Sequence, residues 1–334
     1  MTTGVLARYA SLLFGFALLS ALLLYNGVAA IGAALATAGA GLIVVALFHL
    51  LPIALDARAW WHVLPPCERP PIGTYVFARW ICFSVNSLLP VMQVGGNVVR
   101  ARLLARGGVD GVRAAASVVV DMTTLVLSQV LFALLGLALL AARLGADTPA
   151  VPVVSGIAVM ALLVLGFYLV QQRGLFAGLS HGIERVLGGA WLTSSATAVD
   201  EAVRALYARR SGTAAATAWH LVSWIVGGAE VWLALHFLGH PVSLMTALLI
   251  ESLGHAVRSA AFAVPGALGV QEAGYLALGR VVDLGPDTSL ALSLAQRVRD
   301  LILGLPGLVV WWMEGAFAAR EVAPERAGEP SGGG

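Results

Sequence analysis

Long runs of apolar residues alternate with short polar segments along this chain. A membrane-spanning α-helix needs about 20 predominantly apolar residues. The runs that come close to or exceed this length predict spanning helices at residues 9–25, 38–55, 113–140, 150–172, 213–238 and 288–313. The pattern therefore predicts an all-α, polytopic membrane protein with about six spanning helices.

Two further apolar stretches are interrupted by proline and glycine. Residues 74–106 contain Pro90, Gly95 and Gly96, and residues 243–282 contain Pro265, Gly266 and Gly269. Proline removes a backbone donor and glycine leaves the backbone free, so a helix running straight through is disfavoured. We predict two re-entrant segments that enter, break and return. Irregular backbone at bilayer depth is tolerated only beside protein or a water-filled cavity, so the breaks are candidate functional sites.

Polar segments between the runs predict loops and surface elements. Asp56 to Gly73 contains charged residues and paired prolines, which favour a solvent loop, with Asp56 and Arg58 reaching the membrane interface. Residues 173–211 combine five arginines with apolar positions at helical spacing, which predicts an amphipathic helix on the cytoplasmic face. The polar tail, residues 317–334, is predicted to be disordered.

Arginine-rich loops predict the orientation, because short loops of this kind stay in the cytoplasm. Residues 100–113 contain four arginines and residues 173–211 contain five. Both termini are then cytoplasmic and residues 141–149 lie outside. The first broken segment enters from the cytoplasm and the second enters from outside.

This topology divides the chain into two halves of opposite orientation, residues 1–145 and 146–316. Each half has two spans, one broken segment and a third span. Interrupted segments at corresponding places in two halves indicate an inverted-repeat transporter with its site between the repeats. The alternative is two unrelated kinked helices, since the halves share a pattern more than residues.

The composition agrees with a membrane protein and narrows the chemistry. Apolar residues make up 59% of the chain and charged residues 11%, against about 25% charged in soluble domains. All twenty basic residues are arginine, which excludes lysine Schiff-base chemistry, and no basic domain suggests nucleic-acid binding. We expect no cofactor and no metal site, because Gly239 and Pro241 end the helix around His236 and His240.

Ionisable residues recur inside the predicted apolar segments, where a charge costs a few kcal/mol and normally faces a cavity or a partner. They are Asp121, Glu230, Glu251, His255, Arg258, Arg297, Arg299 and Asp300. We predict that Asp121 pairs with Arg297 or Arg299, and that Asp300 pairs with an arginine of the first half. Such pairs would serve either a transport path or simply the joining of the two repeats.

Amide and carboxylate side chains accompany both breaks. Asn86 and Gln93 flank the first break, and Gln271 and Glu272 follow the second. The helix that restarts at the first break presents its positive end, where anions bind well, and Arg100 follows one turn later. Glu272 either contributes to a site or caps the restarted helix.

Two groups of sequence runs resemble those of a known protein family. The run LLPVMQVGGNVVRARLLARGG with AAASVVVD, and the run VPGALGVQEAGYLALG with SLAQRVRDLILGLPGL, resemble the transmembrane region of lysylphosphatidylglycerol synthases and the wider flippase-like family of bacterial inner-membrane proteins. The runs FARWICFSVNSLLPVMQVGG and HLLPIALDARAWWHVLPP are most similar to the branch found with hopanoid biosynthesis genes, the HpnL proteins. The resemblance covers roughly residues 1–316.

The resemblance implies a flippase-like lipid transporter of the inner membrane that handles hopanoids or another polar-headed or anionic lipid. Lysyl transfer belongs to a soluble domain of the related synthases, and only a short polar tail follows the last span here, so we expect no enzyme. Other lipid-biosynthesis or lipid-export membrane proteins are candidate partners. The candidate lipid path comprises Asn86, Pro90, Gln93, Gly95, Gly96, Arg100, Asp121, Arg258, Pro265, Gly266, Gly269, Gln271, Glu272, Arg297, Arg299 and Asp300. The alternatives are an integral membrane lipid-modifying enzyme and a non-transporting scaffold of a lipid-biosynthetic complex.

Overall fold

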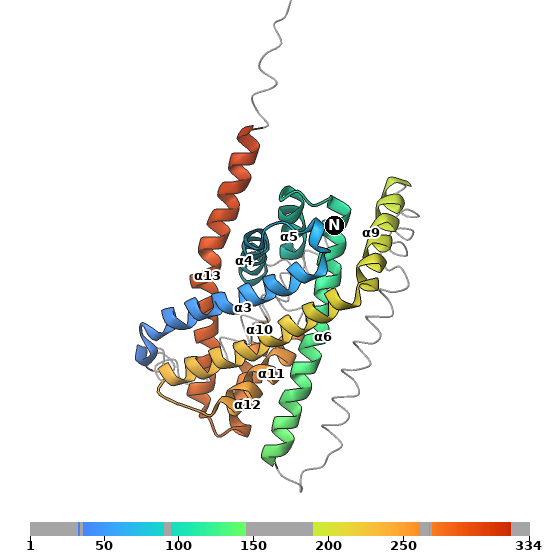
Figure 1. Cartoon of the computed structure of the whole chain (residues 1–334). Helices are drawn as coiled ribbons and strands as arrows, with labels where there is room; N and C mark the ends of the chain where they lie inside the picture. The colour runs from blue at the N-terminus through green and yellow to red at the C-terminus, as the bar shows by residue number, and fades with distance from the viewer. Residues whose placement is uncertain are drawn as a thin grey trace, which may run out of the picture.

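The computed structural model describes residues 33, 36–89, 95–144, 190–260, 267 and 269–321. The regular structure of these residues is entirely helical (Figure 1). The helices are α3 (Gly41–Val63), the 3₁₀ turn η1 (Pro66–Glu68), α4 (Ile72–Leu88), α5 (Gly95–Arg106), α6 (Gly111–Leu144), α9 (Ala190–Ala208), α10 (Arg210–Phe237), α11 (Leu244–Ala260), α12 (Val270–Val281) and α13 (Pro286–Glu321). The spans predicted at residues 9–25 and 150–172 lie outside the described residues.

Three of the described helices are long and apolar enough to cross a membrane: α3, α6 and α10. They account for the predicted spans at residues 38–55, 113–140 and 213–238. Helix α13 contains the span predicted at residues 288–313 but continues to Glu321, into the polar segment beyond it. The predicted all-α fold class is thus confirmed for the described residues, and three of the predicted spans are helices of sufficient length and apolarity.

The predicted loop from Asp56 to Gly73 is wrong over its first part, because α3 continues through Asp56 to Val63. The helix can continue because these residues find partners inside the bundle rather than in water. Trp60 is fully buried, and its indole packs edge-on against Tyr75 at a centroid distance of 4.9 Å. The polar turn is confined to residues 64–71, between α3 and α4.

The first broken segment forms two antiparallel arms, α4 and α5. Near the break, the backbone N–H of Gly96 donates to Oδ1 of Asn86 at 2.9 Å. At the opposite ends of the two helices, a Cβ on Gly107 would lie 2.9 Å from Cγ2 of Thr74. The arms therefore run back along each other, which differs from one continuous kinked helix.

Helices α11 and α12 form a second antiparallel pair. A Cβ on Gly274 would lie 2.8 Å from Cγ1 of Val257, and one on Gly254 would lie 3.4 Å from the Tyr275 ring. Gly269, just before α12, has φ +75°, a left-handed conformation that favours glycine. This pair lies at the lower end of the bundle in Figure 1, whereas α4 and α5 lie at the upper end.

Each helical pair packs against a long helix from the other half of the chain. Helix α4 packs on α13, where the Trp80 indole donates to the Leu303 carbonyl at 3.0 Å. Helix α11 packs on α6, where the Gln129 amide donates to Ser259 at 2.5 Å. Helices α3 and α10 pack against each other between the two pairs (Figure 1).

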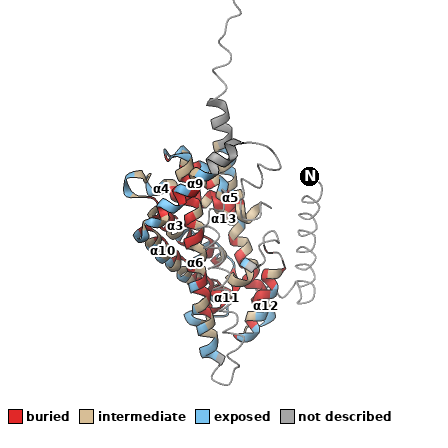
Figure 2. Cartoon of the chain, turned by 90° about the vertical axis from the view of Figure 1, so that its right-hand side faces the viewer, coloured by how far each residue is buried: buried red, intermediate tan, exposed pale blue. Residues whose placement is uncertain are grey.

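The outer surface of the long helices is apolar, and several charged side chains are buried instead. Exposed apolar side chains recur every four residues on α6 (Leu127, Leu131, Leu135) and on α13 (Leu301, Leu305, Val309). Figure 2 shows buried residues gathered where the helices meet. This distribution suits a lipid environment, in which apolar side chains can remain exposed while polar groups need internal partners.

We expect Gly96→Ala to destabilise the protein by about 1–3 kcal/mol, because overpacking a tight contact forces neighbouring atoms to move. The new Cβ would lie 2.5 Å from the Cys82 carbonyl oxygen and 2.7 Å from Oδ1 of Asn86. Gly73→Ala is the matched control, since a Cβ there meets nothing within 4 Å. Thermal unfolding of the purified protein in detergent is the measurement. Equal unfolding midpoints for the two variants would contradict the close packing of α5 on α4.

Candidate charged site between the halves

Asp121 lies in the first third of α6 and is completely buried. Nη1 of Arg100 donates to its Oδ2 at 2.5 Å, and Nη1 of Arg79 lies 3.7 Å from the same oxygen. Nε2 of His220 lies 3.0 Å from its other oxygen, Oδ1. Three helices, α4, α5 and α10, thus each bring one nitrogen-bearing side chain to this carboxylate.

Asp56 extends the same network. Nδ1 of His220 lies 2.9 Å from Oδ1 of Asp56, and Nη2 of Arg79 lies 3.2 Å from its Oδ2. His220 therefore bridges two carboxylates, one on α3 and one on α6. We call Asp56, Arg79, Arg100, Asp121 and His220 the Asp121 cluster. Asp56, expected at the membrane interface, remains 26% exposed while both of its oxygens face partners in the cluster.

The start of α5 positions Arg100. Asn86 accepts the Gly96 N–H, which fixes the first turn of α5 against α4. Arg100 lies one turn later, where its Nε donates to Oδ1 of Asn97 at 2.9 Å. Its guanidinium carbon also lies 4.8 Å from the centroid of the Trp60 ring, a favourable cation–π distance. The predicted break and the buried ion pair are therefore parts of one local structure.

A second buried cluster lies on α10 and α13. Nη1 of Arg299 donates to Oε1 of Glu230, and Nη2 of Arg299 donates to Oδ1 of Asp300 at 2.7 Å. Nδ1 of His49, from α3, lies 2.6 Å from Oε2 of Glu230. We call His49, Glu230, Arg299 and Asp300 the Glu230 cluster.

The predicted pairings between halves are wrong. Asp121 pairs with Arg100 and Arg79 rather than with Arg297 or Arg299, and Asp300 pairs with its neighbour Arg299. The physical reason is the packing of the helices. Asp121 faces α4, α5 and α10, whereas Arg299 on α13 faces α10 at Glu230.

The two halves are instead joined by an exchange of histidines. His220 of α10 completes the Asp121 cluster, and His49 of α3 completes the Glu230 cluster. Helices α3 and α10 each contribute one histidine and one carboxylate to these contacts, and the pairs His49–Glu230 and Asp56–His220 place the helices antiparallel. Between the two pairs, the Ser223 hydroxyl donates to the Pro52 carbonyl at 3.1 Å.

Glu272 at the second break both caps a helix and forms an ion pair. Its Oε2 accepts the Gly269 N–H at 2.7 Å, which satisfies a backbone donor at the start of α12. Its Oε1 accepts Nε of Arg297 at 2.7 Å and the Ser293 hydroxyl at 3.0 Å. Gln271 donates to the same hydroxyl at 2.9 Å.

Three of the ionisable residues, Glu251, His255 and Arg258, lie on α11 near Gln296 of α13. Oε1 of Gln296 accepts Nη2 of Arg258 at 2.8 Å and the Tyr275 hydroxyl at 2.9 Å. Its Nε2 donates to Glu251 at 3.5 Å, and His255 lies 3.5 Å from the other Glu251 oxygen. Among the described residues, no group of three or more His, Cys, Asp or Glu side chains is arranged to hold a metal ion.

The structure brings the predicted path residues together in separate clusters rather than in one site. Pro90, Gln93, Pro265 and Gly266 lie outside the described residues. Three important residues were missed by the sequence reasoning: His49, Arg79 and His220. The signal that could have found them was the same for each, a single ionisable residue inside an otherwise apolar stretch.

The comparison with known families agrees with the buried charges and apolar surface of this bundle. The sequence model of the lysylphosphatidylglycerol synthase TM region matches residues 9–307. The chain belongs to this family. The family match covers both charged clusters and both helical pairs, so the whole candidate site lies within the shared membrane region. No curated protein and no solved structure matches the chain.

Membership of this family makes the chain a multi-pass, lipid-related membrane protein, and the buried ion pairs must then persist in an apolar surrounding. We expect Asp121→Leu alone to destabilise the protein by about 3–5 kcal/mol, because Arg100 keeps its charge but loses its closest partner. The double variant Asp121→Leu/Arg100→Met should lose less than the sum of the two single losses. Unfolding in detergent measures both.

Asp283→Asn serves as the control for that experiment. It removes an exposed partner of Arg143, at 3.2 Å, and exposed pairs contribute little to stability. Additive losses for Asp121→Leu and Arg100→Met would show that the buried pair is not energetically coupled.

Proposed function

We propose that this chain moves a polar-headed lipid across the bacterial inner membrane along a path between its two halves. The observation that carries the proposal is the reciprocal arrangement of those halves. Two antiparallel helical pairs enter the bundle from opposite ends, and each half supplies a histidine to the buried charges of the other. Such an arrangement suits a protein whose halves change their mutual position around a central site.

The pattern of helix packing supports an inverted repeat. Helices α3, α4, α5 and α6 correspond in order to α10, α11, α12 and α13. Under this correspondence the packing of α4 on α13 mirrors that of α11 on α6, and the α3–α4 contact mirrors the α10–α11 contact. The central contact between α3 and α10 is unchanged by this correspondence, because the correspondence exchanges the two helices. We therefore treat the two helical pairs as re-entrant segments of two inverted halves.

Two arginines of the Asp121 cluster, together with Tyr75 on α4, offer hydrogen-bond donors to a polar headgroup. Nε of Arg79, Nη2 of Arg100 and the Tyr75 hydroxyl are buried and have no hydrogen-bond partner among the described residues. Buried donors without partners are rare in proteins, and we take these three as candidate contacts for a headgroup. Asp56, the partly exposed member of the cluster, connects these donors to the protein surface.

The lipid we propose is a hopanoid or another polar-headed lipid, in keeping with the resemblance of the first half to the HpnL branch. A lipid-modifying enzyme would be favoured instead if the purified protein changed a lipid chemically. A scaffold would be favoured if neutral substitutions of the buried charges left function intact in folded protein. Comparing the lipids of inner and outer membranes with and without the gene separates transport from both.

The proposed orientation places the arginine-rich end of the bundle in the cytoplasm. The α5–α6 junction and the C-terminal part of α9 pack into one apolar cluster and so lie at the same end. Single cysteines at 105–112 and 190–210 should be labelled by a membrane-impermeant reagent only from the cytoplasm, because arginine-rich segments stay inside. Cysteines at 143–149 should be labelled from outside. Labelling of 143–149 only from the cytoplasm would overturn both the orientation and the inverted repeat.

Lipid movement should depend on both breaks. Gly96→Leu and Gly269→Leu should each abolish it in membrane-inserted protein at matched abundance, because Gly96 contacts α4 closely and Gly269 has a positive φ. Pro90→Ala should have a milder effect, and Gly73→Leu should move lipid like the parent. Proteoliposomes with a tail-labelled lipid, whose outer-leaflet label is reduced chemically, give the rate. Normal rates in both leucine variants would exclude the breaks as the working site.

A further inference from the structure

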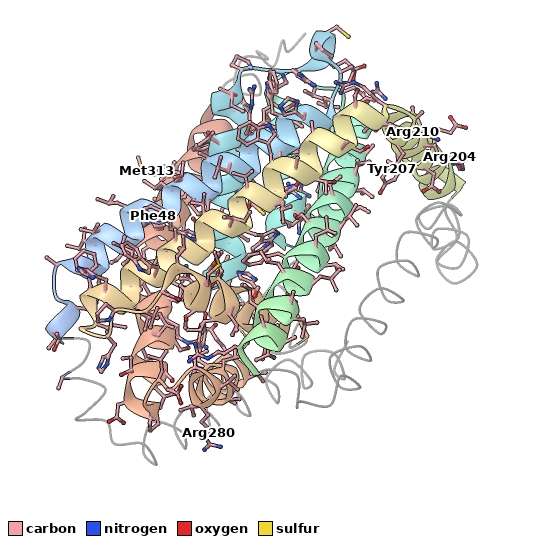
Figure 3. All side chains as sticks on the ribbon, turned by 60° about the horizontal axis from the view of Figure 1, so that its bottom comes forward. Phe48, Arg204, Tyr207, Arg210, Arg280 and Met313 are labelled. Carbon is pink, nitrogen blue, oxygen red and sulfur yellow. The ribbon has the colours of Figure 1, made fainter. Side chains whose placement is uncertain are left out.

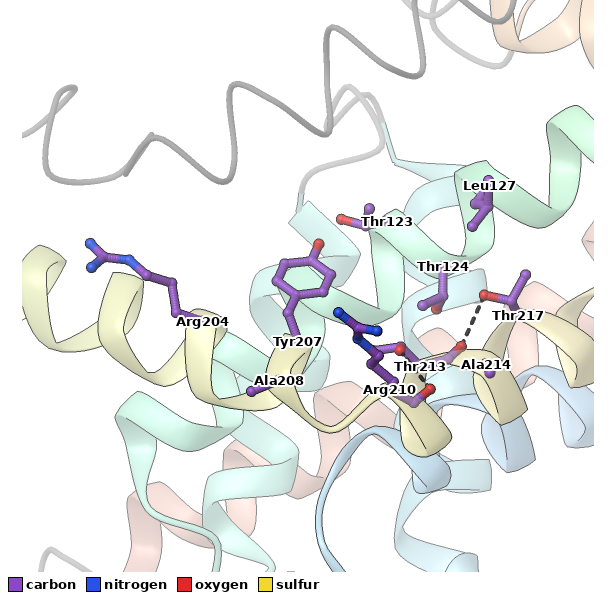
Figure 4. A pocket seen from close by; sticks show the side chains of 10 residues that line it. All are labelled: Thr123, Thr124, Leu127, Arg204, Tyr207, Ala208, Arg210, Thr213, Ala214 and Thr217. Atoms are coloured by element: carbon purple, nitrogen blue, oxygen red, sulfur yellow. Dashed lines mark hydrogen bonds between the residues drawn. The ribbon is translucent and has the colours of Figure 1, made fainter.

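A pocket of about 630 Å³ lies between α6, α9 and α10 at the arginine-rich end of the bundle (Figure 4). Its described lining includes two arginines and four threonines and no carboxylate. Arg210 lies at the first residue of α10, and Arg204 lies on α9 at the outer edge of the pocket. The lining is therefore positively charged, unlike the balanced Asp121 cluster.

Arg204 and Arg210 are available to a ligand. Both are exposed, and neither forms an ion pair with any carboxylate in the part of the chain that the structure describes. Arg113, near the start of α6, is by contrast paired with Glu68 at 2.6 Å. Two guanidinium groups beside one cavity favour a phosphate, because the planar fork matches phosphate oxygens.

Four threonines from α6 and α10 line the pocket. The Thr217 hydroxyl donates to the Thr213 carbonyl at 2.9 Å, and the Thr124 hydroxyl donates to the Asp121 carbonyl at 2.9 Å. Their protons are therefore committed to their own helices, which leaves the arginines to donate to a phosphate. Thr217 also lies one turn before His220 on α10. The pocket thus borders the buried site without sharing its charged residues.

An apolar path leaves the pocket along α6. Leu127 lines the pocket and is 41% exposed, and Leu131 and Leu135 follow it on the same helix face with 43% and 38% exposed. At 1.5 Å per residue this stripe runs for about 12 Å along the helix. A soluble phosphate compound gains nothing from such a stripe, whereas an acyl chain would pack against it.

We propose that this pocket binds the phosphate headgroup of an anionic membrane lipid, with Arg204 and Arg210 on the phosphate and an acyl chain along Leu127, Leu131 and Leu135. The inference deepens the proposed function, since it places the substrate beside the Asp121 cluster, and it rests on that function for any movement of the lipid after binding. The binding itself requires no transport.

Native mass spectrometry of the full-length protein in detergent tests the binding. The probes are dioctanoyl phosphatidic acid, dioctanoyl phosphatidylcholine, dioctanoylglycerol and inorganic phosphate. The parent should retain phosphatidic acid most strongly, and Arg204→Gln/Arg210→Gln should weaken its binding about tenfold or more. Arg280→Gln is the control, because Arg280 is exposed at the opposite end of the molecule (Figure 3). Thermal unfolding confirms that the variants remain folded.

Three results would overturn the proposal. They are equal binding by the double variant and the parent, an equal loss in Arg280→Gln, and complete displacement of the lipid by an equimolar amount of inorganic phosphate. Leu131→Gln adds a separate check: it should weaken phosphatidic acid binding but not phosphate binding, since only the lipid uses the stripe.

Lipid movement by the same variants in proteoliposomes separates this proposal from the proposed function. Loss of binding in the double variant, with no lipid movement by the parent, would refute transport and leave the binding site standing. Lipid movement by the parent, with unchanged binding in the double variant, would refute the pocket alone.

Discussion

A buried carboxylate in an apolar helix bundle needs positive charge and hydrogen-bond donors close by, and Asp121 is where this need is greatest. It is fully buried on α6, and its partners come from α4, α5 and α10. Each of these helices must keep its position for the charge to remain satisfied. In a membrane, where interhelical hydrophobic attraction is weak, such polar contacts carry much of the specificity of packing. The Glu230 cluster places the same demand on α10, α13 and α3.

The long helices were predictable because a membrane-spanning helix requires a long apolar run in its own sequence. Run length identified α3, α6 and α10, and the proline and glycine breaks marked both antiparallel pairs. Which helix faces which was not predictable, because an apolar face can pack against any other apolar face. The pairing of Asp121 depends on that choice, so the sequence pointed to the right residue and the wrong partner. The same holds for Asp300, whose partner is the adjacent Arg299.

Asp56 illustrates how tertiary contacts override a local pattern. A charged residue at the end of an apolar run resembles the end of a membrane span. Only the tertiary structure shows that Asp56 pairs with His220 and Arg79 inside the bundle. Glu272 illustrates the opposite case. The two roles considered for it, a helix cap and a charged contact, occur together, because its two oxygens face different partners. Local geometry was thus easier to predict than long-range contacts.

Helix α3 contains Pro52 between its two contacts with α10, at His49 and Asp56. A proline inside a helix removes one backbone hydrogen bond and makes that point easier to bend. The point at which α3 bends most easily therefore lies between His49, which belongs to the Glu230 cluster, and Asp56, which belongs to the Asp121 cluster. The Ser223 hydroxyl, bonded to the Pro52 carbonyl, fastens this point to α10. Bending there would move His49 and Asp56 about a shared pivot, so neither cluster is mechanically independent of the other.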